Sequence, residues 1–158
     1  MLAMINRIVL ETSRATNLVD ALSLIVSHIL ETLSADACSI FLCDDESGEY
    51  VLLATHGLNA DLIGKARVKF GEGLVGLVGE REEAINLSNA PEHPQFHSFS
   101  KLELNDYQGF LGVPIIFRAN LLGVLVVQQK EARVFAEDER LRSDLSSARR
   151  QNLILVFE

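Results

Sequence analysis

Residues 71–76, with the sequence GEGLVG, place three glycines at the spacing G-x-G-x-x-G. In dinucleotide-binding proteins this spacing forms a turn that brings the backbone against a pyrophosphate, between a strand and a long helix that leads to a parallel strand. The apolar run that follows Gly73 predicts a helix of about nine residues, which is short for a parallel crossover. The motifs of protein kinases and the G-K-[ST] of a phosphate-binding loop are absent from the sequence. We therefore interpret the glycines as structural.

Gly73, Gly76 and Gly79 recur every three residues, so they fall near one face of the predicted helix. A helix face without side chains can approach a sheet closely, and it can leave room for a small ligand between the helix and the sheet. The glycines therefore predict close packing and a candidate pocket, but no nucleotide site.

Two histidines have the spacing of a metal pair. His93 and His97 lie four residues apart, but Pro94 disfavours a helical conformation at His93. The sequence shows no third ligand and no H-E-x-x-H motif, so we expect no metal. It also shows no G-x-S-x-G motif and no case for a Ser-His-Asp triad.

The two cysteines, Cys38 and Cys43, lie in the run ACSIFLCD, which reads as a strand. Their odd separation places them on opposite faces of that strand, and five residues of extended chain exceed the reach of a disulfide. We interpret both as small apolar strand residues.

Composition limits the function classes. The chain has 158 residues, 48% of them hydrophobic and 23% charged, as in one soluble globular domain. Its net charge of −8 and the lack of a basic cluster argue against nucleic acid as a partner. No apolar run approaches the roughly 18–20 residues that span a bilayer, and the start of the sequence does not resemble a signal peptide. We expect a cytoplasmic protein that is not bound to a membrane.

The elements that must position these residues can be read from their periodicity. Apolar residues at helical spacing predict a helix after Asn17, which we expect to be its N-cap. A shorter helix is expected before it, and another after residue 136. The long polar run 88–107 contains two prolines and is expected to be irregular. Strands are expected at 37–44, 50–56, 67–70, 83–87, 109–117 and 120–129.

The last two strands are joined by a tight turn, so they must pair antiparallel. Neither alternates between polar and apolar residues, which indicates that both faces of the sheet are covered. We therefore predict a three-layer α/β/α domain around an antiparallel sheet. Pro114, inside a strand, predicts an edge position or a bulge.

The chain resembles the GAF domain family. The resemblance is carried by FGEGLVGLVGEREEAINLSNAPEHPQF and GFLGVPIIFRANLLGVLVVQQKEARVFAEDE, and the opening hairpin also matches. It implies a single domain over 1–158 with a core at about 17–139, flanking helices at 1–16 and 140–158, and about six antiparallel strands with helices on both faces. GAF domains act as small-molecule sensing modules, and their terminal helices often pair in dimers. The polar segment 140–158 weakens that last expectation.

Within the family, EGLVGLVG, INL, FLGVPII and LLGVLVVQQ are similar to the GAF domains of nitrogen-related phosphoenolpyruvate–protein phosphotransferases. This implies a bacterial regulatory domain that signals to an attached catalytic domain, with glutamine a candidate effector. The active histidine and barrel of those enzymes are absent, so we expect no enzymatic activity in this chain. Two alternatives stay open: a dimerisation or interaction module without ligand, and the GAF domain of a nitrogen-regulatory transcription activator.

Other functions of the family match less well. Bilin-binding GAF domains and free methionine sulfoxide reductases use loop cysteines, whereas both cysteines here fall in a strand. The N-K-x-x-F pattern of cyclic-nucleotide-binding GAF domains is not found between residues 86 and 107. We expect no cofactor.

The resemblance places a ligand pocket between the sheet and residues 86–107. We expect its floor to be the strand 110–114 and one wall to be the helix that begins at Gly73. The candidate apolar lining residues are Phe41, Phe70, Leu74, Val78, Phe96, Phe99, Leu111 and Val113. The candidate polar anchors are Asn86, His93 and Ser98. For each residue the alternative is core packing or capping.

Overall fold

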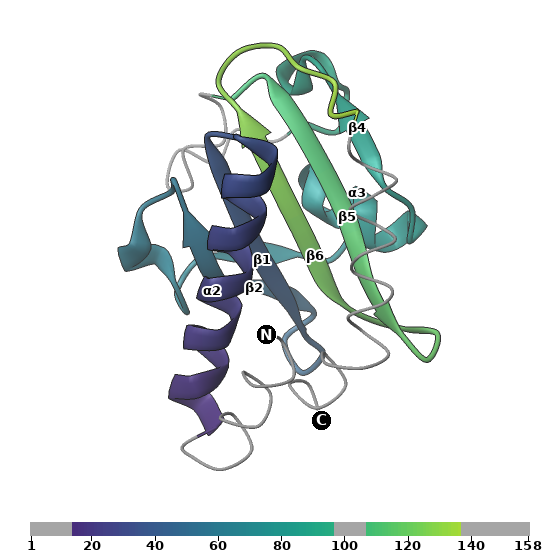
Figure 1. Ribbon diagram of the computed structural model, residues 1–158. Helices are drawn as coiled ribbons and strands as arrows, with labels where there is room; N and C mark the ends of the chain where they lie inside the picture. Colours follow the sequence, from purple (N-terminus) through teal and green to yellow (C-terminus); the bar gives the residue numbers. More distant parts are fainter. Residues whose placement is uncertain (1–13, 97–106, 137–158) are drawn as a thin grey trace.

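The computed structural model describes residues 14–96 and 107–136. Its centre is a six-stranded antiparallel sheet with the order β3-β2-β1-β6-β5-β4 (Figure 1). The strands are β1 (Ala37–Asp44), β2 (Glu49–His56), β3 (Arg67–Lys69), β4 (Ile85–Leu87), β5 (Gly109–Phe117) and β6 (Asn120–Gln129). The antiparallel sheet and the bounds of β1, β5 and β6 confirm the predictions from sequence.

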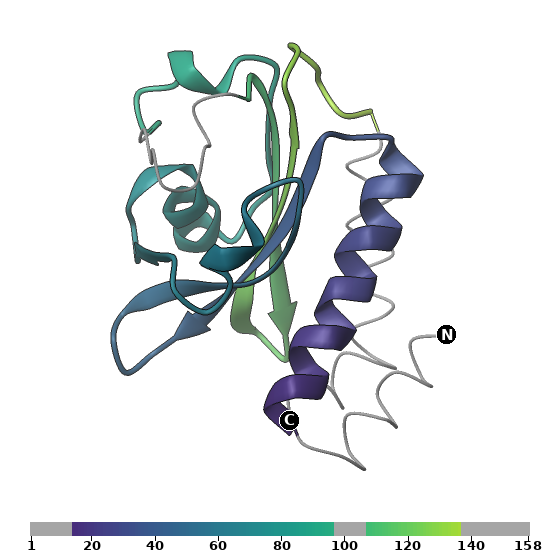
Figure 2. The same ribbon diagram turned by 90° about the vertical axis from the view of Figure 1, so that its left-hand side faces the viewer.

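Helices cover both faces of the sheet. The long helix α2 (Arg14–Leu33) lies against one face, and α3 (Gly73–Arg81) lies against the other, together with the short 3-10 turns η1 (Ala60–Leu62) and η2 (Ala90–Glu92) (Figure 2). The prediction of a three-layer α/β/α fold is therefore confirmed. Neither of the two described α-helices is both long and apolar enough to cross a membrane.

Each face of the sheet has its own hydrophobic core, and β6 shows how one strand serves both. Val124 and Val126 belong to the core beneath α3, which we call the α3-face core. Leu125 and Val127 belong to the core beneath α2, which we call the α2-face core. Because successive side chains on a strand point to opposite faces, a strand between two cores must be apolar at almost every position.

Two details of the strands follow the sequence. Pro114 lies beyond the part of β5 that pairs with β4, so the first of the two alternatives predicted for it, a local edge position, is confirmed; the register shift comes later, between Ile115 and Ile116. Cys38 lies in the α2-face core and Cys43 packs against the α3-face core, so the two free cysteines occupy opposite faces as predicted.

The predicted start of α2 is wrong. Asn17 lies inside the helix, which already includes Arg14. Asn within a helix costs only a few tenths of a kcal/mol relative to average residues, so one capping residue is a weak signal for a helix end. The helices expected within 1–13 and 137–158 lie outside the described residues.

Candidate functional site

The glycine motif forms the entry to α3. Gly71 and Gly73 have φ values of +77° and +65°, a region that glycine adopts without strain. A Cβ atom on Gly76 would lie 2.6 Å from the carbonyl carbon of Gly71, so the helix folds back tightly onto its own entry turn. The glycines therefore have the structural role expected from the sequence.

Gly79 explains how closely α3 approaches the sheet. A Cβ atom at this position would overlap the hydroxyl of Tyr50 on β2 and lie 3.2 Å from a methyl carbon of Leu121 on β6. This close approach to the sheet was predicted for the whole glycine face, but between Gly76 and Gly79 it applies only to Gly79. Gly76 faces the entry turn instead.

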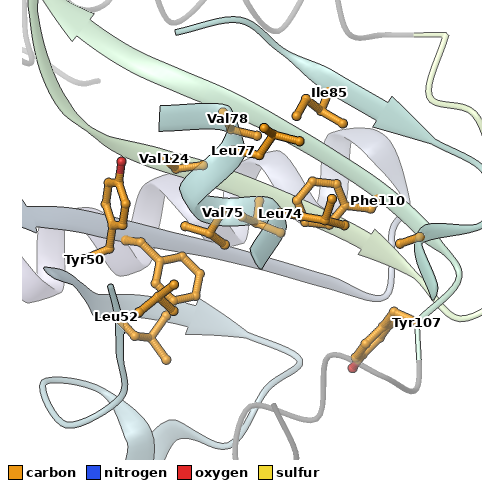
Figure 3. Packing of buried hydrophobic residues seen from close by; sticks show 14 of the residues in the cluster. Tyr50, Leu52, Leu74, Val75, Leu77, Val78, Ile85, Tyr107, Phe110 and Val124 are labelled. Carbon is orange, nitrogen blue, oxygen red and sulfur yellow. The ribbon is translucent and has the colours of Figure 1, made fainter. Parts of the chain in front are cut away.

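The underside of α3 packs against the middle of the sheet. Leu74, Val75 and Val78 are buried between the helix and the strands, with Phe110 of β5 among them (Figure 3). A Cβ atom on Gly112 would lie 2.6 Å from Cγ2 of Val78, so this glycine makes the close contact between α3 and β5 possible.

Several of the predicted lining residues lie on this face. Phe41, Leu74 and Val78 belong to the α3-face core, and Phe96 packs against it. Phe70 lies at its margin, where the side chain is 43% exposed and its ring contacts that of Tyr50 edge to face at 4.8 Å. Ser98 and Phe99, like His97, lie outside the described residues.

The prediction placed three residues on the wrong face. Leu111 and Val113 belong to the α2-face core, and Asn86 lies between Ile85 and Leu87, whose side chains pack on the α3 face. All three are therefore separated from α3 by the sheet. The physical reason is that β5 is apolar on both faces, so its sequence does not reveal which residues point toward α3. The described floor beneath α3 is formed by Phe110 and Gly112.

Two of the predicted polar anchors are used within the fold. The amide of Asn86 donates to the carbonyl oxygen of Phe135 at 2.8 Å and accepts from the nitrogen of Phe135 at 3.0 Å. Nδ1 of His93 accepts from the backbone N–H of Gln95 at 3.0 Å. The first contact joins β4 to the segment after β6, and the second stabilises the local chain path after η2.

The polar groups on the α3 face are ones that the sequence analysis missed. Ser39 lies between Ala37 and Phe41, which are both in the α3-face core, so its side chain points to the same face. Thr55 is its partner on β2, and their hydroxyl oxygens lie 2.8 Å apart in a hydrogen bond. Gln128 follows Val124 and Val126 on this face of β6. Their exposed fractions are 1%, 7% and 2%.

A signal for these residues exists in the sequence. Ser39 interrupts the apolar run of β1, and Gln128 ends that of β6. In strands that are otherwise apolar on both faces, such polar residues mark positions where hydrogen bonding is needed.

Tyr107 closes this end of the face. Its side chain is 4% exposed, and its hydroxyl donates to the carbonyl oxygen of Gly57 at 3.4 Å, so the ring reaches from the start of β5 toward the end of β2. Gly57 has a φ of +104°, and a Cβ atom there would overlap the main chain at Asp36. The tight turn after β2 thus brings an acceptor within reach of Tyr107.

A small cluster of charged side chains surrounds Arg67. Arg67 donates to Asp44 at 3.1 Å and to Glu49 at 3.4 Å at the exposed end of the β1–β2 hairpin, and this lowers the pKa of Asp44. Burial raises the pKa of Cys43 to about 11 and that of Tyr50 to about 12. Within the described residues, no group of three His, Cys, Asp or Glu side chains is arranged to hold a metal ion.

Comparison with known proteins agrees with this geometry. The family model of the GAF domain matches residues 17–145. The GAF domain from a phosphoenolpyruvate–protein phosphotransferase of Coxiella burnetii is 49% identical, with 96% of this chain and 94% of that chain covered and a TM-score of 0.74. The corresponding domain from Acinetobacter is 35% identical, with 93% and 91% covered and a TM-score of 0.70.

A longer relative gives the wider context. The phosphoenolpyruvate-dependent phosphotransferase system protein of Escherichia coli K12 is 41% identical over 139 residues, which is 88% of this chain. The chain spans 19% of the length of that relative.

Proposed function

The chain belongs to the GAF domain family, and we propose that it is the sensing domain of a phosphoenolpyruvate–protein phosphotransferase, which binds a small metabolite on its α3 face. Ligand binding on the α3 face would produce a signal that this domain passes to catalytic domains attached to it in a longer protein. Glutamine is the candidate effector, and regulation by nitrogen status in a bacterial cytoplasm is the proposed setting. The similarity to GAF domains of such enzymes supports the proposal that the longer protein is a phosphoenolpyruvate–protein phosphotransferase. The catalytic step would belong to the other domains of that protein.

The observation that carries ligand binding is the burial of Ser39, Thr55 and Gln128 together beneath an otherwise apolar face. Burying polar side chains costs free energy unless hydrogen bonds compensate. A domain that needed only a core would keep apolar residues at these three positions. A small polar ligand supplies a reason for the polar ones.

The remaining candidate residues are part of this proposal. Phe41, Leu74, Val78 and Phe96 surround the same face of the sheet and would supply apolar contact. Ser98 and Phe99 stay as predictions from sequence, and so does the pocket wall expected from residues 97–106.

A second candidate function is helix-mediated pairing without a ligand. Leu24 is 58% exposed on the outer face of α2, where a solvent-facing helix position would normally be polar. A second copy of the chain that packs against α2 would cover it. This is the interaction module that competes with the sensing domain.

A thermal-shift screen with glutamine, 2-oxoglutarate and cyclic nucleotides tests the proposal. A ligand that binds only the folded domain stabilises it by about 2.7 kcal/mol at a concentration one hundred times its Kd. We expect a saturable rise in Tm with one of these compounds. No shift with any of them, alongside a tight dimer in light scattering, would favour the interaction module.

A further inference from the structure

An exposed aromatic ring lies where the β1–β2 hairpin meets the entry to α3. Phe70 follows β3, and its side chain is 43% exposed. Its backbone N–H donates to the carbonyl oxygen of Gly48 in the hairpin at 2.9 Å, and its ring contacts that of Tyr50 edge to face at 4.8 Å. Exposed aromatic side chains are enriched where one protein contacts another. Phe70 is therefore a candidate for such a contact.

Two carboxylates at the end of α3 lie beside this ring. Oε2 of Glu80 is 3.9 Å from the position that a Cβ atom on Gly71 would take, and Gly71 directly follows Phe70. Burial is the largest cause that raises the pKa of Tyr50, and the negative charges of Glu80 and Glu82 act in the same direction, so both lie near its hydroxyl. Both glutamates are exposed. We call Tyr50, Phe70, Glu80 and Glu82 the Phe70 surface.

The hydroxyl of Tyr50 reaches this surface without a hydrogen-bond partner in the described part of the chain. The residue as a whole is 2% exposed, and Figure 3 shows it at one edge of the apolar cluster. A Cβ atom on Gly79 would overlap its hydroxyl, so this oxygen lies next to the position where Glu80 begins. A phenol that makes no hydrogen bond can accept one from an N–H group of a partner.

The negative charge beside Phe70 is not compensated by the described cations nearby. Arg67 is held in two ion pairs on the hairpin. Arg67 and Lys69 alternate with Val68, which points into the α3-face core, so both lie on the opposite face of the sheet from Phe70. Arg81 lies between the two glutamates in sequence but forms no ion pair with either. The Phe70 surface thus combines an aromatic ring with unpaired carboxylates, which fits a cation.

The geometry favours a guanidinium over other cations. A guanidinium is planar and stacks on aromatic rings, and its five N–H donors can reach a carboxylate and a phenol oxygen together. The ammonium of lysine is more strongly hydrated and lacks this planar set of donors. Nucleic acids and anionic membranes carry the wrong charge for a surface with unpaired carboxylates. The fitting partner is therefore a protein segment that contains arginine.

We propose that the Phe70 surface docks an arginine side chain from a basic segment of a partner protein. The guanidinium lies against the ring of Phe70 and donates to the carboxylate of Glu80 and the hydroxyl oxygen of Tyr50, and Glu82 adds to the attraction. Tyr50 and Thr55 are five positions apart on β2, which corresponds to about 17 Å of strand. The surface is therefore separate from the buried Ser39–Thr55 pair, and this inference does not depend on the binding of a metabolite.

The first test measures binding of the 158-residue chain to two labelled peptides by fluorescence anisotropy. One peptide alternates arginine with serine, and the other alternates lysine with serine. The wild-type chain should bind the arginine peptide more tightly, and added salt should weaken the binding. Glu80→Gln should weaken it about fivefold. Glu92→Gln is the matched control, because it removes the same charge from an exposed position on η2, and it should bind as the wild type does.

The second test examines the ring and the hydroxyl. Phe70→Leu keeps an apolar side chain but removes the aromatic face, so it should weaken binding of the arginine peptide about threefold. Tyr50→Phe removes only the hydroxyl. Because this hydroxyl has no hydrogen-bond partner in the described part of the chain, the variant should keep the urea midpoint of the wild type and still bind the peptide more weakly.

Four results would overturn the inference. The first is that the arginine peptide does not bind. The second is that Glu92→Gln weakens binding as much as Glu80→Gln, since net charge alone would then explain the attraction. The third is that Phe70→Leu and Tyr50→Phe both bind as the wild type does. The fourth is that free arginine binds as tightly as the peptide, because the ligand would then be the amino acid and not a protein segment.

Discussion

The side-chain amide of Asn86 makes two hydrogen bonds with the main chain of Phe135, at 2.8 Å and 3.0 Å. This contact joins the edge strand β4 to the segment that follows β6, 49 positions later in the chain. It holds Phe135 in the α2-face core, where the guanidinium of Arg133 lies 4.4 Å from its ring centre. A residue that the sequence offered as a ligand anchor is therefore a clamp between two parts of the fold.

The clamp predicts the effect of Asn86→Ala. Loss of two hydrogen bonds, each contributing about 0.5–1.5 kcal/mol, should lower the free energy of unfolding by about 2 kcal/mol. Urea denaturation measures this value. Asn89→Ala is the control, because Asn89 makes no side-chain capping bond at the start of η2. This variant should lower the free energy of unfolding by less than about 0.5 kcal/mol. Equal losses in the two variants would contradict the clamp.

Gly79→Ala should be among the more destabilising substitutions in α3. The new methyl group would overlap the Tyr50 hydroxyl, and overpacking of this kind costs about 1–3 kcal/mol. Tyr50→Phe removes the overlapping oxygen, so the double variant should lose less stability than the sum of the two single variants. A double-mutant cycle in urea measures this coupling. Strict additivity would show that the two residues do not meet.

The turn between β5 and β6 contains strain that glycine would relieve. Arg118 and Ala119 have φ values of +50° and +65°, in a two-residue turn for which Asn-Gly is the preferred sequence. Ala119→Gly should raise the free energy of unfolding by about 0.5–1 kcal/mol, since the left-handed conformation costs an L-residue about 1–2 kcal/mol and the added chain entropy offsets part of this gain. Ala60→Gly, in η1, is the control and should not stabilise. Thermal unfolding compares the two variants.

The sequence predicted the elements of this fold better than it predicted which way their side chains point. Strands β1, β5 and β6 were found from their apolar runs, and the lack of alternation correctly indicated two covered faces. The same lack of alternation removed the signal that assigns Leu111 and Val113 to one face, so both were placed beneath α3 when they lie beneath α2. Only polar residues such as Gln128 indicate which face of the sheet a strand position points to. Gly112 gives the same information, because its missing side chain allows the contact with Val78.

Contacts distant in sequence were beyond prediction for a different reason. No local sequence pattern around Asn86 or Phe135 identifies the other as its partner. The close approach of Tyr50 to Gly79 depends on how β2 is placed beneath α3. Such contacts follow from the packed arrangement and not from periodicity, so the structure was needed to separate clamp residues from candidate ligand contacts.

Stability should fall in alkaline solution. Burial is the largest cause that raises the pKa of Cys43 from 9.0 to about 11, with the charge of Asp45 second, and burial also raises the pKa of Tyr50 from 10.0 to about 12. The folded state therefore holds these protons more tightly than the unfolded state. The stabilisation is complete below pH 9 and is lost as the pH rises through 9–11 for Cys43 and 10–12 for Tyr50.

Urea midpoints between pH 7.5 and 11 measure this effect. Cys43→Ala should reduce the slope between pH 9 and 11 without abolishing it, since burial also raises the pKa of Cys38. A midpoint that stays constant over this range in the wild-type chain would show that neither group is protected from ionisation.

The Ser39–Thr55 hydrogen bond should show strong coupling between its two residues. Ser39→Ala alone leaves the Thr55 hydroxyl buried without its partner, and Thr55→Val alone does the same to Ser39, so each should cost about 1–3 kcal/mol. Removal of both hydroxyls leaves no unpaired group. The double variant should therefore lose less free energy of unfolding than the two single variants together, by about 1 kcal/mol or more. A cycle without coupling would mean that water or another group satisfies each hydroxyl independently, and the pair would then not act as one polar unit beneath the α3 face.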